Sequence, residues 1–186
     1  NLEELEDLKT LVNDMLFLAR ADRGERAADL APVSLAAEAR RVAEYYEATL
    51  EEHAVRLRCV GDATVAANRG LARRALANLI SNAIKATPPG GEIVLTCTPT
   101  ARGARVTVHN PGTPIPPADL PRIFDRFFRS GQTRAPRSEG HGLGLAIVRA
   151  IARMHGGDVD AASGAAGTVV GITFNNPGPA ANITKT

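Results

Sequence analysis

The 186-residue sequence predicts an α+β fold: a two-layer sandwich with helices on one face of a mixed sheet, preceded by one long helix. Two observations support it. Stretches with helical period and stretches with strand-like alternation are intermixed without regular βαβ repetition, which favours helices packed on one sheet face. Hydrophobic residues make up 44% and charged residues 23% of the chain, so it should fold around a real core. The length suits one domain with an appendage.

Residues 1–22 are the predicted long helix. Its apolar residues recur at spacings of three and four, at Leu5, Leu8, Val12, Met15 and Ala19. This stripe fits the seam of a helical bundle or an ordinary helix packed on a domain, and both remain open. Residues 23–33 carry no consistent period and indicate a linker. The chain starts at Asn1, already inside the helical pattern, so we expect a fragment of a longer protein.

Residues 34–175 form the predicted globular domain. Helices are expected over residues 34–53, 68–87, 120–129 and 143–155. Strands are expected over residues 55–60, 64–67, 92–98, 104–109, 158–162 and 168–174. Ser34 can cap the first of these helices, Asn68 precedes the second, and the run from Pro88 to Gly91 is a strong helix stop. We expect the polar loop 130–142 to be mobile and residues 176–186 to be a disordered tail.

Composition excludes several classes of protein. Lys and Arg total 22 against 20 Asp and Glu, and a net charge of +2 is too small for a whole-surface attraction to nucleic acid or lipid. Cys59 and Cys97 lack CxxC spacing, so neither a disulfide framework nor a zinc site is encoded, and a reducing cytoplasm is the simplest compartment. No apolar run approaches the roughly 18 residues of a membrane span. We therefore expect no nucleic-acid partner and no membrane contact by this chain.

The predicted helix 68–87 has two faces. Its apolar arc holds Ala72, Leu76, Leu79, Ile80 and Ala83. Its polar arc holds Asn78, Asn82 and Lys85, together with Arg74. An amide oxygen is a suitable ligand for Mg²⁺, and the lysine could meet a phosphate from the same stripe. A solvated helix face is the alternative interpretation of this arc.

A glycine-rich segment, Gly140-His141-Gly142-Leu143-Gly144-Leu145, opens the next predicted helix. Glycines let backbone N–H groups approach an anion, and a helix N-terminus adds unpaired donors with partial positive charge. The pattern therefore predicts a phosphate cradle, although it is neither a P-loop nor a GxGxxG motif. A flexible hinge before the helix is the alternative.

Two further stretches carry candidate functional residues. The loop that begins Asn110-Pro111-Gly112 offers an amide that could read an adenine edge, or it is simply a good turn. The stretch from Ile123 to Arg129 holds three of the five phenylalanines beside a basic loop. It suggests a lid whose one end is anchored by the aromatic side chains, or a short core helix with solvated arginines.

Together, in this order, the four stretches resemble the N, G1, F and G2 boxes of sensor histidine kinases, over residues 1 to about 175. The resemblance implies the histidine-kinase and Hsp90-like ATPase fold. Residues 1–22 resemble the second helix of the family's dimerisation and phosphotransfer hairpin. The stretch from Leu11 to Asp22, taken with the loop after Asn110, is most similar to the heavy-metal (copper, silver, zinc) sensor kinases.

The resemblance implies an ATP-dependent protein-histidine kinase that uses Mg²⁺ and passes phosphate to a response regulator. Asn82 would ligate Mg²⁺, Lys85 and Arg129 would meet phosphate oxygens, and Asn110 would read the adenine amino group. Gly140, Gly142 and Gly144 would line the triphosphate. The other implied ATP-site residues are Asn78, Gly112, Ile115, Phe124, His141, Leu143 and Leu145. The parent protein would form a homodimer anchored in the bacterial inner membrane, with weak self-association of this chain.

The sequence also departs from the family pattern. The G1 box usually starts with Asp, Pro114 stands where its second glycine is usual, and Ala86 replaces an aromatic that usually flanks the nucleotide. None of the four histidines has the neighbours of the phosphoacceptor, so the acceptor is expected outside these residues. Two alternatives remain: an ATPase, although Asn78 stands where such enzymes place a Glu base, and a nucleotide-binding regulatory module without catalysis.

Overall fold

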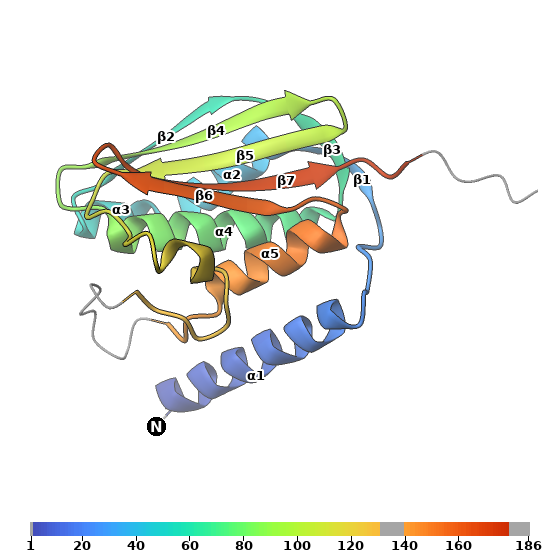
Figure 1. Ribbon diagram of the computed structural model, residues 1–186, viewed down its shortest axis with the longest axis horizontal. Coiled ribbons are helices and arrows are strands. Elements are labelled where there is room, and N and C mark those ends of the chain that lie inside the picture. The colour runs from blue at the N-terminus through green and yellow to red at the C-terminus, as the bar shows by residue number, and fades with distance from the viewer. Residues whose placement is uncertain (1, 131–139, 179–186) are drawn as a thin grey trace, which may run out of the picture.

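The computed structural model describes residues 2–130 and 140–178 (Figure 1). Most of the loop expected to be mobile, and most of the predicted tail, lie outside these described residues. The helices are α1 (Leu2–Asp22), α2 (Leu35–Tyr45), α3 (Glu47–Glu52), α4 (Arg69–Ala86) and α5 (Gly144–Met154), with a 3₁₀ turn at Leu120–Arg122. The strands are β1 (Ala31–Ser34), β2 (Arg56–Gly61), β3 (Thr64–Ala67), β4 (Glu92–Thr100), β5 (Gly103–Asn110), β6 (Val159–Gly164) and β7 (Gly167–Asn175).

A five-stranded sheet with the order β2-β4-β5-β7-β6 forms one layer. β2 runs parallel to β4 and the other neighbours are antiparallel, so the sheet is mixed. Along β5, Ala104, Val106 and Val108 are buried, whereas Thr107 and His109 are partly exposed. This alternation gives the sheet one buried face. Helices α2, α4 and α5 cover that face, which confirms the predicted α+β sandwich (Figure 1).

Helix α4 supplies the centre of the helical layer. Leu76 and Ile80 are fully buried and Leu79 is 2% exposed, so the predicted apolar arc faces the core. The predicted N-cap at Ser34 forms: its hydroxyl oxygen accepts from the Ala37 N–H at 3.1 Å. Asn68, the residue expected just before the helix, is also an N-cap, and its amide oxygen accepts from the Leu71 N–H at 3.0 Å. These caps fix where α2 and α4 begin.

A buried histidine ties the end of α5 to the start of α4. His155 is 4% exposed; its Nδ1 lies 2.8 Å from the Ile151 carbonyl oxygen, and its Nε2 accepts from the Asn68 N–H at 3.1 Å. Because Nε2 must accept while Nδ1–H donates, the ring is neutral. Burial lowers the pKa of His155 from its ordinary value, against the opposing effect of the Ile151 hydrogen bond. The neutral ring is therefore part of the folded structure.

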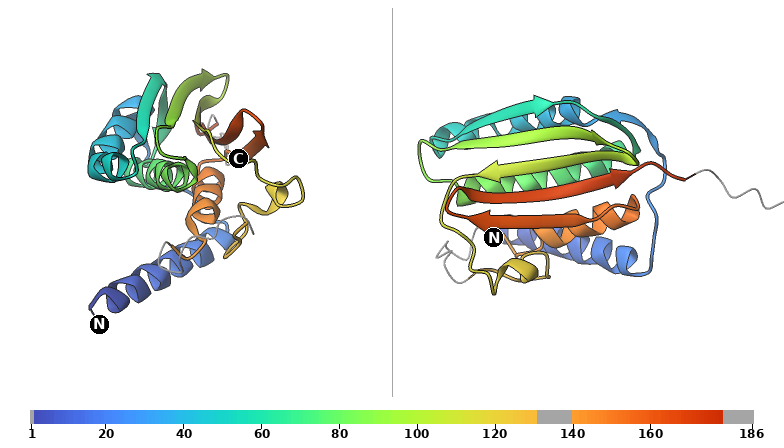
Figure 2. Two further views of the ribbon diagram at one scale, coloured as in Figure 1. Left: turned by 90° about the vertical axis from the view of Figure 1, so that its left-hand side faces the viewer. Right: turned by 45° about the horizontal axis from the view of Figure 1, so that its top comes forward.

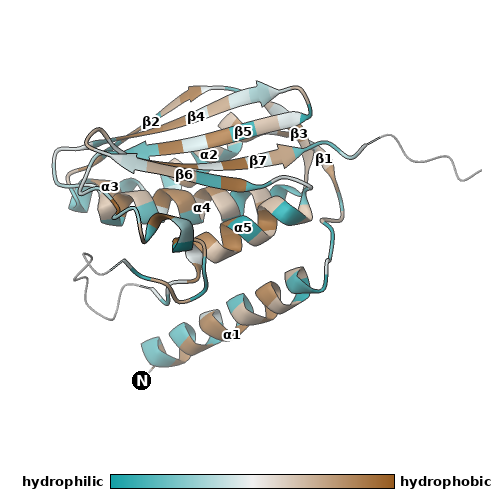
Figure 3. Cartoon of the chain, viewed as in Figure 1, coloured by the Kyte–Doolittle hydropathy of each residue, from teal (hydrophilic) through white to brown (hydrophobic). Residues whose placement is uncertain are grey.

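Helix α1 lies beyond α5, away from the sheet, in each view (Figures 1 and 2). Leu18 is 3% exposed in the core, and the Arg74 guanidinium contacts both the Asp14 carboxylate at 2.5 Å and the Phe17 ring at 4.4 Å. Apolar bands nevertheless continue along α1 (Figure 3). The exposed members of its stripe are Leu2, Leu5, Leu8, Val12, Met15 and Leu16. Only part of the apolar surface of α1 is covered by its own domain.

Three local predictions differ from the structure. The helix expected over residues 120–129 is only the 3₁₀ turn, because Phe127 adopts a left-handed φ of 60°, which interrupts a right-handed helix. The helix expected over residues 34–53 divides into α2 and α3 at Tyr46. β1 was not predicted; it pairs antiparallel with β3 and buries Val33. Among the described residues, no helix has the length and apolarity to span a bilayer.

Candidate nucleotide site

The polar arc of α4 lines one side of the candidate site. Asn82 and Lys85 are exposed, and Asn78 is half-buried. The Asn78 side-chain N–H donates to the Arg74 carbonyl oxygen at 2.9 Å, which holds its amide oxygen toward the neighbouring helix. The stripe expected from periodicity therefore lies on one accessible face.

The glycine-rich segment lies directly against this stripe. A Cβ added to Gly144 would lie 2.9 Å from the Asn78 amide oxygen, and one added to Gly140 would lie 3.3 Å from the Lys85 Nζ. Gly140 and Gly142 have φ of 94° and 72°, a left-handed backbone that favours glycine. Spacing alone could not show that the two motifs meet. The structure brings them into contact.

The first turn of α5 provides backbone donors at this junction. Its N-cap residue is Leu143, whose apolar side chain accepts no capping hydrogen bond from the N–H groups of the first turn. The leading N–H groups of a helix have no partner within the helix and carry partial positive charge. With Lys85 beside Gly140, the junction of α4 and α5 is suited to an anion.

An open cleft adjoins the C-terminal end of α4. It has a volume of about 490 Å³ and is lined by Lys85, Ala86, Thr87, Pro88, Gly112 and Thr113. Gly112 has a φ of 146°, and a Cβ there would collide with the Ala86 carbonyl oxygen. Only glycine lets the loop after β5 approach α4 this closely. The cleft therefore places the start of the predicted adenine loop beside the polar stripe.

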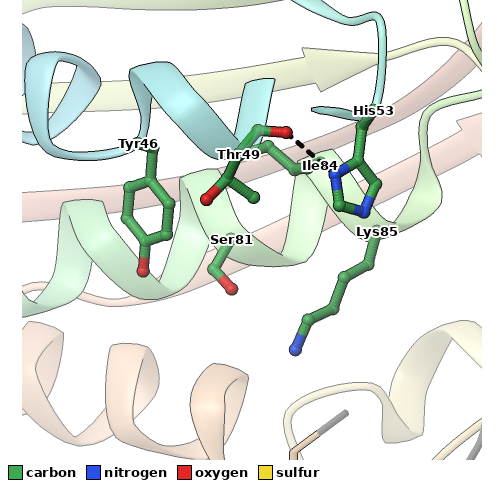
Figure 4. A pocket seen from close by; sticks show the side chains of 6 residues that line it. All are labelled: Tyr46, Thr49, His53, Ser81, Ile84 and Lys85. Carbon is green, nitrogen blue, oxygen red and sulfur yellow. Dashed lines mark hydrogen bonds between the residues drawn. The ribbon is translucent and has the colours of Figure 1, made fainter. Parts of the chain in front are cut away.

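A second, smaller pocket of about 120 Å³ lies between α3 and α4 (Figure 4). Tyr46, Thr49 and His53 line it from the α3 side, opposite Ser81, Ile84 and Lys85 of α4. The His53 Nδ1 lies 2.8 Å from the Thr49 carbonyl oxygen. Burial raises the pKa of Tyr46, partly offset by its hydrogen bond with Ser81. Sequence reasoning missed the α3 residues, since they belong to no motif and reach Lys85 only through packing.

The remaining predicted residues divide by burial. Phe124, Leu143 and Asn110 are 7%, 2% and 5% exposed, while Leu145 is half-buried against the core. The half-buried Ile115 donates its N–H to the Ser163 hydroxyl at 2.9 Å. Arg129, His141 and Gly140 are exposed. Phe124 and Leu143 therefore position the backbone around the site, whereas Arg129 and His141 reach solvent.

The described residues contain no group of three or more His, Cys, Asp or Glu side chains that could hold a metal ion. A divalent cation at this site would therefore need oxygen donors of another kind. Mg²⁺ keeps several waters and is held by few protein groups together with substrate phosphates. The exposed amide of Asn82, on the stripe beside the anion-binding junction, fits that requirement.

A family model described as histidine kinase-, DNA gyrase B-, and HSP90-like ATPase matches residues 67–178. The chain belongs to this family. The sensor histidine kinase CusS of Escherichia coli (strain K12) is 46% identical over 175 residues, which cover 94% of this chain and 36% of CusS. The chain thus spans about a third of the length of the curated relatives that it matches. The resemblance to sensor histidine kinases is confirmed.

Solved structures agree with this assignment. Full-length ShkA in complex with AMPPNP has a TM-score of 0.75 at 30% identity, over 95% of this chain and 38% of ShkA. The histidine kinase ThkA in complex with response regulator protein TrrA has a TM-score of 0.69 at 27% identity, over 94% of this chain and 49% of ThkA. Both similarities extend over nearly the whole chain.

Proposed function

We propose that this chain is the ATP-binding catalytic region of a sensor histidine kinase, which transfers the γ-phosphate of ATP to a histidine elsewhere in its parent protein. The observation that carries the proposal is the junction at which Lys85 and Asn78 of α4 meet Gly140 and Gly144 at the start of α5. This junction joins cationic and backbone donors beside a cleft large enough for a base. Phosphoryl transfer depends mainly on such positioning and charge stabilisation.

The proposed roles combine the resemblance with the contacts of the junction. Lys85 and Arg129 meet phosphate oxygens, and the backbone of Gly140, Gly142 and Gly144 lines the triphosphate. The cleft beside Gly112 receives the base, next to Asn110. Asn82 would hold Mg²⁺, which supplies neutralisation of phosphate charge when bound. Ile115, Phe124, His141, Leu143 and Leu145 complete the walls of the site, as their family positions imply.

Asn78 argues against an ATPase. Its amide nitrogen donates to the Arg74 carbonyl oxygen, and its amide oxygen faces Gly144. An amide has no basic lone pair comparable to that of a carboxylate, and a missing general base costs roughly 10²- to 10⁴-fold in rate. Water activation is therefore unsupported at the position where related ATPases place a glutamate.

We propose partners for the parent protein as well. A response regulator is supported by the similarity to ThkA, whose solved complex contains response regulator protein TrrA. A homodimer is supported by the exposed apolar stripe of α1, which would pair in a helical bundle. Metal sensing and an inner-membrane anchor stay predictions about the parent, drawn from the resemblance.

Calorimetric titration with Mg-ATP tests the binding step. The wild-type chain should bind, EDTA should weaken binding, and Asn82→Ala should abolish Mg²⁺-dependent binding. Asn13→Ala is the matched control, since Asn13 is an exposed asparagine on α1 and not on α4. Equal affinity in wild type and Asn82→Ala would remove Asn82 from the metal site, and no binding by the wild type would refute the proposed function.

A further inference from the structure

Asn110 occupies an unusual position at the end of β5. It is the last residue of the strand and continues the inward-facing series of Val106 and Val108, so its side chain points from the sheet toward the helical layer. At 5% exposure it is one of the few buried polar side chains in the described part of the chain. A buried amide at a strand end needs hydrogen-bond partners.

The amide borders the cleft at the end of α4. The Asn110 Nδ2 lies 3.8 Å from the position that a Cβ on Gly112 would take, and Gly112 lines the cleft together with Ala86 and Thr87. Gly112 contributes no side chain. The Asn110 amide therefore lies next to Gly112, at the edge of the cleft.

The amide has hydrogen-bonding capacity left for a ligand. Its Nδ2 donates one hydrogen to the Pro111 carbonyl oxygen at 3.0 Å. Within the described residues, no other hydrogen bond of this side chain is seen, so the second N–H and the Oδ1 remain for a bound base. An amide thus offers one donor and one acceptor side by side, whereas a carboxylate would offer acceptors alone.

We infer that the site accepts 6-oxopurine as well as 6-aminopurine nucleoside triphosphates, with Asn110 as the residue that permits both; this rests on the proposed function. Adenine presents an amino donor beside the N1 acceptor, and guanine presents the O6 acceptor beside the N1–H donor. The Asn110 amide matches adenine in the orientation held by Pro111. It matches guanine after the amide group rotates so that its oxygen and nitrogen exchange places.

The expected preference for ATP over GTP follows from this rotation of the Asn110 amide. Turning the amide gives up its hydrogen bond to the Pro111 carbonyl oxygen, and one neutral hydrogen bond corresponds to roughly a two- to tenfold change in affinity. Of the residues that line the cleft, Ala86, Pro88 and Gly112 provide no side-chain donor or acceptor, and the Thr87 hydroxyl donates to the Ala83 carbonyl oxygen. The other two, Lys85 and Thr113, add little discrimination, because an ammonium can donate to a ring nitrogen of either purine and a hydroxyl both donates and accepts. ATP should therefore bind better than GTP by no more than about tenfold.

Calorimetric titrations of the wild-type chain with Mg-AMPPNP and with Mg-GMPPNP test the inference. Dissociation constants within about tenfold of each other are expected. AMPPNP binding with GMPPNP more than about tenfold weaker would overturn the inference and leave the proposed function standing. Binding of neither would refute the proposed function. Because this comparison uses the unaltered protein, it holds even if a variant at Asn110 folds poorly.

Asn110→Asp tests the role of the residue itself. A carboxylate accepts from the adenine amino group but repels the guanine O6, so GMPPNP affinity should fall by roughly tenfold or more relative to AMPPNP. Asn13→Asp adds the same charge at an exposed position on α1 and should leave the ratio unchanged. Circular dichroism confirms folding of each variant. An unchanged ratio in folded Asn110→Asp would remove Asn110 as the specificity residue.

Discussion

Replacing Leu76 with alanine should lower the free energy of unfolding of this domain by about 2–5 kcal/mol, the range for a buried leucine that leaves a cavity. The structure supports this magnitude because Leu76 is fully buried, on the face of α4 that packs under the sheet. For a chain of this size, 1 kcal/mol corresponds to roughly 2–4 °C in melting temperature. The expected decrease is therefore about 4–20 °C.

Asn82→Ala, on the opposite face of the same helix, should give the reverse result. Asn82 is exposed, and exposed substitutions usually change stability by about 0.5 kcal/mol or less. Its melting temperature should stay within about 2 °C of the wild type. The stabilisation by added Mg-ATP should disappear in Asn82→Ala and persist in Leu76→Ala at temperatures where that variant is folded.

Thermal denaturation followed by circular dichroism, with and without Mg-ATP, gives both quantities. Leu79→Ala, at 2% exposure, is the matched core control and should behave as Leu76→Ala does. Two results would refute the two-face reasoning. One is a Leu76→Ala variant as stable as the wild type, and the other is an Asn82→Ala variant that Mg-ATP still stabilises.

Three further predictions concern protonation, thiol reactivity and association. Because the pKa of His155 is lower in the folded than in the unfolded chain, its contribution to stability is complete above about pH 6.5 and is lost as the pH falls. Denaturant titrations should show that the free energy of unfolding falls between pH 7 and pH 5, and that His155→Gln makes this fall smaller. The same pH dependence in the variant would exclude His155 as its source. Burial raises the pKa of Cys97 to about 12, so its thiol should react with Ellman's reagent only after unfolding, and rapid native reaction would contradict its burial. Leu5→Lys with Leu8→Lys should weaken concentration-dependent association in analytical ultracentrifugation, and unchanged association would move the contact elsewhere.

Local pattern predicted the parts of the fold that depend on neighbouring residues. The α4 stripe and the alternation of β5 follow from helical and strand periods, and each is present in the structure. The helix expected over residues 120–129 failed because apolar spacing gave no sign of the left-handed backbone at Phe127, whose N–H donates to the Gly142 carbonyl oxygen. That contact joins segments separated by the loop.

Packing between distant segments accounts for what the sequence could not predict. Glu38 looks like an exposed helical charge, yet it is 2% exposed because Arg73 of α4 binds its carboxylate at 2.8 Å. Tyr46 and His53 belong to no motif and reach Lys85 only because α3 packs beside α4. The resemblance assigned the nucleotide role to Lys85, but only the structure shows that its amine lies beside Gly140.

Phosphoryl transfer to a separate acceptor tests the central claim most directly. The chain is incubated with Mg-ATP labelled at the γ-phosphate, alone and with the histidine-containing hairpin of its parent, and the products are tested for acid-labile phosphohistidine. We predict label on the hairpin, none on this chain alone, and loss of transfer in Asn82→Ala but not in Asn13→Ala. Acid-labile label on this chain alone, or ATP binding without any transfer to the hairpin, would contradict the account.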